Sequence, residues 1–168
     1  MTFDLRTLYD ALDEHRRSRG LSWAAATLEI NRGATTGHPI AASTITGLKD
    51  KPVGEGDGIL QMLLWLGRTP ESFIPGFPDP DSERFRLPTP TAQQVLRWDV
   101  RALHAALDAQ RRARGTTWAA LAHEIGGVAP STLTNLAKGG RIGFPSPVMR
   151  IVTWLDQPAV RFTHLARR

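Results

Sequence analysis

The stretch Ala129-Pro130-Ser131-Thr132-Leu133-Thr134-Asn135-Leu136-Ala137-Lys138-Gly139 decides the fold. Pro130 suits the first turn of a helix, where its missing N–H leaves no hydrogen bond unmade. Leu133 and Leu136 stand three residues apart and share one side of that helix. Gly139 and Gly140 end it. The stretch therefore predicts a short helix with an apolar inner side and an outer side of small polar residues.

A second short helix is expected directly before it, over Thr117–Ile125. Thr117 has a side chain suited to cap the first turn. The joint Gly126-Gly127-Val128 is short and rich in glycine, as in a tight turn between helices. Two short helices joined by such a turn are typical of a helix-turn-helix.

The run from Thr117 to Gly139 resembles the helix-turn-helix of the lambda-repressor-like (Cro/XRE) family of bacterial DNA-binding proteins. The family pattern is a capped helix ending in Ile-Gly, a Val, a small residue, and a Ser/Thr-rich recognition helix closing on Gly. This chain departs from it by one residue, because Gly126-Gly127 stand where one Gly is usual. The resemblance implies an all-α domain that reads duplex DNA. An Ala-rich helical hairpin of any small bundle is the alternative interpretation.

The chain also repeats itself. Phe3–Ile30 matches Trp98–Ile125 after a shift of 95 residues, with 15 of 28 positions identical. Further along, Ser43–Thr46 corresponds to Ser131–Thr134, and Trp65 corresponds to Trp154. We therefore predict a tandem duplication of one module.

Each copy is expected to hold four to five helices. Leucines at helical spacing predict the first helix of each copy, and apolar runs around Ile59 and Val148 predict the fourth. In the second copy, Thr91 and Gln94 have capping-box spacing, which predicts one long helix from about residue 91 to Arg114. The four tryptophans that recur in equivalent places are expected in the core: Trp23, Trp65, Trp118 and Trp154.

The fold class predicted is thus all-α, with two lambda-repressor-like domains and a proline-rich linker. Residues 1–74 form the first domain, 75–90 the linker and 91–168 the second domain. Prolines in the linker disfavour regular structure and favour a stiff, extended connector, which Phe77 and Phe85 are placed to pin against a domain.

The resemblance also implies which residues meet DNA. In the family, residues at the start and outer face of the third helix contact base edges, and the start of the second helix touches a phosphate. Asn135 is the favoured base reader, because an amide can donate to and accept from adenine. The residues expected to contact DNA are Thr117, Pro130, Ser131, Thr132, Thr134, Asn135, Lys138 and Arg141 in the second copy, with Ser43, Thr44, Thr46 and Lys49 in the first.

The first copy departs from the family pattern. A twelve-residue loop, 31–42, replaces the tight turn, and Gly47 stands where the second copy has Asn135. Glycine has no side chain with which to read a base, so this copy is expected to read DNA less well. It is expected to serve pairing or regulation instead, unless Arg32 and His38 of the loop reach a groove or phosphates.

Charge is divided unevenly along the chain. The whole protein carries a formal net charge of +5, but residues 1–74 have a net of −1, residues 75–97 of zero and residues 98–168 of +6. An excess of basic residues in the second copy is what a phosphate-binding surface requires. The arginines that end the first helix of each copy, such as Arg16 and Arg111, are better explained by the helix dipole than by phosphate.

Other classes of protein find little support. There is no cysteine, so thiolate zinc sites and disulfides are excluded. The histidines have no metal-ligand spacing, and Gly54-Glu55-Gly56-Asp57-Gly58 lacks the Lys-Ser/Thr of a phosphate-binding loop. We expect no cofactor, no bound metal and no catalysis. No leader or membrane span is evident, so a cytoplasmic, nucleoid-associated location is expected.

The predicted function is sequence-specific binding of double-stranded DNA by a transcriptional regulator. The two copies would act as a covalent pseudo-dimer, or the chain would form a homodimer through the first copy. The alternative is a protein–protein interaction module, such as an antitoxin or regulatory adaptor, that keeps the helical scaffold and engages a regulatory protein through the acidic first copy.

Overall fold

Helices dominate the computed structural model, which describes residues 1–32 and 39–167. In the first copy, α1 spans Leu5–Ser18, α2 Trp23–Arg32, α3 Ala42–Thr46 and α4 Gly56–Leu66. In the second copy, α5 spans Val100–Ala113, α6 Trp118–Ile125, α7 Pro130–Asn135 and α8 Val148–Leu155. Short 3₁₀ turns follow at Gly47–Lys49, Pro70–Phe73, Glu83–Phe85, Leu136–Lys138 and Ala159–Phe162.

The two copies repeat each other in detail. Asp4 caps α1 and Asp99 caps α5 through their side-chain carboxylates. The backbone N–H of Asp4 donates to Phe73 O, as that of Asp99 donates to Phe162 O. Because the same caps and the same closing contact recur, the duplication read from the sequence extends to three-dimensional structure.

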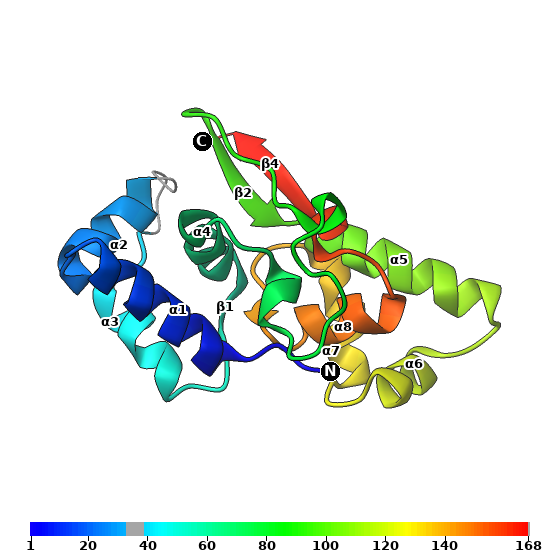
Figure 1. The fold of residues 1–168 in the computed structure, drawn as a ribbon. Helices are drawn as coiled ribbons and strands as arrows, with labels where there is room; N and C mark the ends of the chain where they lie inside the picture. The colour runs from blue at the N-terminus through cyan, green and yellow to red at the C-terminus, as the bar shows by residue number, and fades with distance from the viewer. Residues whose placement is uncertain (33–38, 168) are drawn as a thin grey trace.

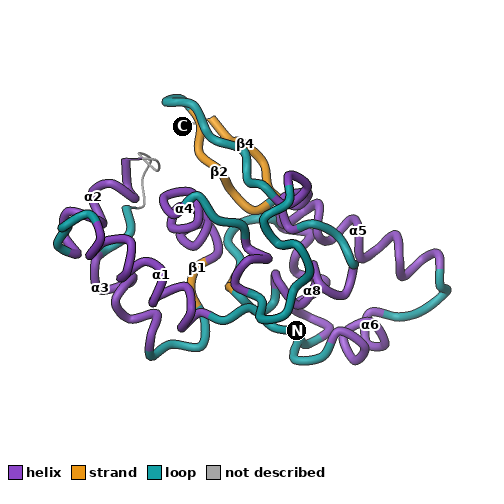
Figure 2. Tube along the Cα trace, in the orientation of Figure 1, coloured by secondary structure: helices purple, strands orange, loops and turns teal. Residues whose placement is uncertain are grey.

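The all-α prediction is wrong. The described residues also form two antiparallel two-stranded sheets, drawn in orange in Figure 2. One pairs β1 (Gly54–Glu55) with β3 (Gly143–Phe144), and the other pairs β2 (Gln94–Trp98) with β4 (Thr163–Arg167). Each sheet joins segments that are distant in sequence, so no local pattern revealed the partner strand.

The long helix expected from residue 91 is also wrong. Thr91 and Gln94 do interact, since Thr91 N donates to the Gln94 side chain and Gln94 N donates to Thr91 O. These contacts close a turn that leads into β2, and helix α5 begins only after Asp99. Residues 94–98 gain a full ladder against β4, which satisfies their backbone groups better than an exposed helical turn would.

The sheet β1·β3 joins the two copies across a pseudo-twofold axis. Gly54 lies five residues before Ile59 of α4, and Gly143 lies five residues before Val148, the equivalent residue of α8. The two glycines therefore occupy equivalent positions. Gly54 pairs with Phe144, which is the equivalent of Glu55 in the second copy. Glu55 in turn pairs with Gly143, the equivalent of Gly54. That reciprocal register is the signature of an isologous contact. The chain therefore folds as a dimer-like pair of copies within one polypeptide.

A continuous core fills the junction between the copies. Figure 1 places α1–α3 on one side and α5–α6 on the other, with α4 between them. Trp98 is 3% exposed; its indole N–H donates to Gly56 O at 3.0 Å, and its ring stacks on Phe144. Phe3, the counterpart of Trp98, packs in a T-shaped arrangement with the same Phe144 ring. Aromatic side chains of both copies thus share one buried cluster.

The four recurring tryptophans lie at the edge of this core. Trp23, Trp65, Trp118 and Trp154 are half-buried and pack against it, whereas the fully buried tryptophan is Trp98. Their polar or cationic neighbours explain the position: the Trp65 N–H donates to Glu29, and Arg114 lies over the Trp154 ring. The prediction that all four are core residues is therefore only partly right.

The connector 75–90 is held against the protein. Phe85 and Leu87 are buried, and the Phe77 ring meets the Phe85 ring edge-on at 5.3 Å. The Thr69 hydroxyl donates to Pro80 O at 2.8 Å. The expected pinning by two phenylalanines is present, and one 3₁₀ turn interrupts the extended path.

Glu71 provides a polar link between the copies. The side chain is 1% exposed, and its Oε1 accepts from Ala159 N at 2.7 Å. Burial raises the pKa of the Glu71 carboxyl above its ordinary value, since the hydrogen bond from Ala159 N and the charge of Arg84 only partly oppose that effect.

Glu71→Gln is expected to raise the melting temperature at neutral pH and to lose this advantage in acid. When folding raises the pKa of an acid, the acid makes its full contribution to the free energy of unfolding at pH values below the pKa it has in the unfolded chain. That contribution is lost as the pH rises through the pKa it has in the folded protein. The amide removes that loss and can still accept from Ala159 N. Thermal unfolding between pH 4 and 8 measures the difference, at about 2–4 °C per kcal/mol for a chain of this size. A variant less stable than wild type at pH 8 would contradict this account.

Candidate nucleic-acid interface

The α6–turn–α7 unit forms where the sequence placed it. Thr117 caps α6 by accepting from Ala120 N at 3.1 Å. Gly126 and Gly127 both have positive φ, at 76° and 69°, which glycine adopts without strain. The apolar side is buried through Leu121 and Leu133. The turn residues thus set α7 against α6 with its polar side outward.

The outer face of α7 is exposed and largely free of internal partners. Pro130, Ser131, Thr134 and Asn135 are exposed, while Thr132 is half-buried. The Thr134 hydroxyl donates to Ser131 O at 3.2 Å. The described part of the chain provides no hydrogen-bond partner for the Asn135 amide. This amide is therefore available to a ligand.

Two arginines hold the ends of this unit. Arg150 donates to Gly126 O at 3.4 Å, and its guanidinium lies against Gly127. Arg101 donates to Lys138 O at 3.3 Å and lies against Gly139. Carbonyls that the helix ends leave unpaired are thereby satisfied, and positive charge is placed at both ends of the motif.

A cleft lined with arginine opens beside the end of this unit. It has a volume of about 580 Å³ and lies between the β2·β4 sheet, the start of α5 and residues 139–141. The Nε atom of Arg97 is buried there without a hydrogen-bond partner among the described residues. The basic residues lining the cleft are Arg97, Arg101, Arg141, His164 and Arg167.

The two acids of the cleft are already engaged by the backbone. Asp57 accepts from Trp98 N at 2.9 Å, and Asp99 accepts from Ala102 N at 3.0 Å. Burial raises the pKa of Asp57, with the nearby Glu55 charge adding to the shift. The four arginines of the cleft therefore outnumber its two acids, a balance that favours an anion such as phosphate.

Sequence reasoning identified Arg141 but not its neighbours in the cleft. Arg97 lies in strand β2, within the run for which the sequence predicts a helix, and the strand pairing places it opposite His164. Arg101 is on α5 and Arg167 on β4, so no sequence spacing connects them. The one signal was the charge excess of residues 98–168.

The predicted residues of the first copy lie on and just after α3. Ser43, Thr44 and Lys49 are exposed and Thr46 is half-buried. Thr44 and Lys51 line a cavity of about 400 Å³ together with Arg141 of the second copy. Thr44 of the first copy and Arg141 of the second copy, both predicted to contact DNA, thus line one cavity beside the β1·β3 sheet. Of the loop, His38 lies outside the described residues.

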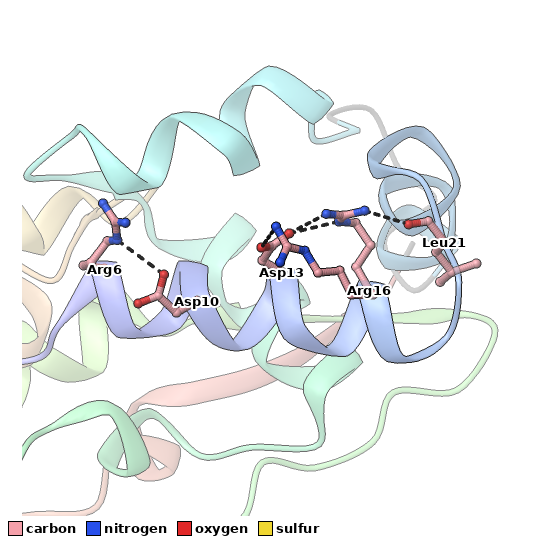
Figure 3. Close-up of polar contacts among 6 residues, drawn as sticks. Arg6, Asp10, Asp13, Arg16 and Leu21 are labelled. Carbon is pink, nitrogen blue, oxygen red and sulfur yellow. Dashed lines mark hydrogen bonds and ion pairs between the residues drawn. The ribbon is translucent and has the colours of Figure 1, made fainter.

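The arginines that end α1 and α5 are engaged in ion pairs. As Figure 3 shows, Arg16 binds the Asp13 carboxylate and donates to Leu21 O at 2.9 Å, which ties α1 to the following turn. In the second copy, Arg114 binds Glu124 with hydrogen bonds of 2.9 and 2.6 Å. The Arg114 hydrogen bond lowers the pKa of Glu124. These arginines are thus engaged by carboxylates within the modules, whereas the sequence alone suggested an interaction with the helix dipole.

The part of the chain that the structure describes contains no cluster of three or more His, Asp or Glu residues arranged to hold a metal ion. Nor does any helix within it have the length and apolar character needed to cross a membrane.

Comparison with known proteins adds no relative. No family model matches the chain, and neither the curated proteins nor the solved structures contain a match.

Proposed function

We propose that the protein binds double-stranded DNA in a sequence-specific manner and regulates transcription. The observation that carries the proposal is the exposed outer face of α7, whose amide and hydroxyl groups project from a helix presented by a glycine turn. A helix of this kind fits the major groove, where Asn135 would contact an adenine edge. This function implies a cytoplasmic location on the nucleoid.

Phosphate contacts would come from the basic residues around α7. Lys138 and Arg141 are exposed just beyond the helix, and Arg101 lies against Gly139. The arginine-lined cleft begins at the same residues. Arg101 and Arg141 also line that cleft, and basic groups of this kind supply most of the sequence-independent affinity for DNA.

The pseudo-twofold arrangement supports a covalent pseudo-dimer on DNA. Dimers of helix-turn-helix proteins bind two half-sites related by the symmetry of the protein. The reciprocal β1·β3 register gives this chain a comparable relation between α3 and α7. Because α3 is followed by Gly47 rather than an asparagine, the two half-sites would differ, and the first copy would contribute fewer base contacts.

Selection of the purified protein on a pool of random duplexes, at low and near-physiological salt, tests the proposal. An enriched motif with two unlike half-sites is the expected result. A single half-site would assign reading to the second copy alone. Binding without any motif would reduce the function to a basic surface, and the absence of binding would favour the rival protein-interaction module.

Arg141→Ala is expected to weaken binding of specific and random duplexes alike. It should also reduce the slope of log K against log salt by about 1, as loss of one phosphate contact does. Arg161→Ala is the matched control, since Arg161 is exposed but does not line the cleft. An unchanged slope in the Arg141 variant would remove this residue from the interface.

A further inference from the structure

A further hollow lies at the junction of the two copies, and its lining includes none of the residues proposed to contact DNA. Its volume is about 420 Å³, within the ~300–1,000 Å³ range of small-molecule sites. Four segments build it: Met1, the end of the first copy at Glu71 and Ile74, the connector at 77–85, and helix α8 of the second copy with the two residues that follow it.

The walls of this hollow are mainly apolar. Ile74 and Phe85 are buried beside it, and Met149 and Val152 contribute from α8. Phe77 and Phe85 present two rings at 85° to each other. Such walls accept an aliphatic or aromatic group, and a perpendicular ring pair offers both a face and an edge to it.

One polar group in the wall is left unsatisfied. The Glu71 carboxylate uses Oε1 to accept from Ala159 N, but Oε2 is buried and has no partner among the described residues. A buried oxygen without a donor costs free energy that a donor would recover. Two further acids, Asp79 and Asp156, line the hollow, where Arg84 is the cationic side chain among the described lining residues and Met1 also lies at the wall.

Arg84 contacts an aromatic wall of the same hollow. The Arg84 guanidinium lies 4.9 Å from the centre of the Phe85 ring, at the connector side of the hollow. The acids among the lining side chains therefore outnumber the cation, and the unmet group is an acceptor. The complementary ligand carries a positive charge and an N–H donor.

We propose that this hollow binds a small organic cation, a primary ammonium attached to a compact aliphatic or aromatic body, with the ammonium donating to Glu71 Oε2. The ligand would contact the first copy, the connector and the second copy at once. Its binding would therefore stabilise the junction between copies. This inference does not depend on DNA binding and can be tested without DNA.

Calorimetric titration and thermal unfolding of the full chain test the proposal with a fixed series of probes: butylammonium, hexylammonium, benzylammonium and 2-phenylethylammonium. Uncharged 2-phenylethanol and anionic phenylacetate are the comparisons. At least one ammonium probe is expected to bind saturably below 10 mM and to raise the melting temperature with concentration, as any ligand of the folded state does. Phenylacetate is expected not to bind.

Glu71→Gln should weaken binding of the ammonium probe at least tenfold while leaving the fold intact by circular dichroism. Glu83→Gln is the matched control, because Glu83 is an exposed acid of the same connector and does not line the hollow. Thr153→Trp, on the exposed side of α8 at the hollow, should also block the probe. Equal binding to wild type and Glu71→Gln, equal binding of phenylacetate, or no binding by any of the ammonium probes would overturn the proposal.

Discussion

Trp98→Ala is expected to lower the free energy of unfolding by about 3–5 kcal/mol, the usual cost of deleting a buried aromatic side chain. Trp98 lies where the two copies meet, with its ring on Phe144 and its N–H on Gly56 O. A loss of this size corresponds to a fall of roughly 6–20 °C in melting temperature. Urea and thermal denaturation of the full chain measure it.

Two further variants separate the effect of the junction from the general effect of losing a tryptophan. Trp154→Ala removes a half-buried tryptophan at the edge of the second copy and should cost clearly less. Trp98→Phe introduces the residue that the first copy has at the equivalent position, Phe3. It keeps a ring on Phe144 but loses the indole hydrogen bond to Gly56 O, at a cost of about 0.5–1.5 kcal/mol. If Trp98→Ala is no more destabilising than Trp154→Ala, the junction is not a principal source of stability.

Asn135→Ala is expected to relax base preference, with a loss of about 1–3 kcal/mol on the preferred duplex and little change on random duplexes. The reason is that the Asn135 amide is exposed, unpartnered and on the outer face of α7. Competition binding between the selected duplex and a random one at fixed salt gives the ratio directly.

Lys138→Ala provides the contrasting variant. Lys138 is exposed just after α7, at the point where its carbonyl accepts from Arg101. Loss of its charge should weaken binding to every duplex by a similar factor and reduce the salt slope by about 1. Equal losses on selected and random duplexes for Asn135→Ala would assign that residue to the backbone and contradict its role as a base reader.

The helical part of the fold was predictable because its signals are local. Leu5, Leu8 and Leu12 recur at helical spacing, and all three are buried on α1. The caps at Asp4 and Thr117 and the turn at Gly126 each depend on a few adjacent residues. The duplication was equally visible, since it needs only a comparison of the chain with itself.

The strands were missed because their partners are remote. The run Gln94–Trp98 is a strand only because Thr163–Arg167 returns to pair with it. With two residues each, β1 and β3 are too short to leave any periodic pattern. A capping-box spacing at Thr91 favoured helix, and the long-range ladder overrode that local preference.

The candidate sites divide in the same way. The face of α7 could be predicted, since its residues are neighbours on one helix. The arginine-lined cleft and the Glu71 hollow could not, because each collects residues from three or more segments brought together by the sheets and the junction. Glu71 occupies the position that Val160 holds in the second copy, and this difference is visible in the sequence. The burial of Glu71 against Ala159 is a consequence of the fold.

The reciprocal pairing of β1 with β3 has a consequence for assembly. In a dimer of separate chains, the symmetric contact forms only when the protein concentration exceeds a dissociation constant. Here the connector keeps both halves of the contact at a high effective concentration, so the pair forms at any dilution. The two halves are also free to differ, because a substitution in one is not copied into the other. Gly56 on one side of the axis and Pro145 on the other already do so.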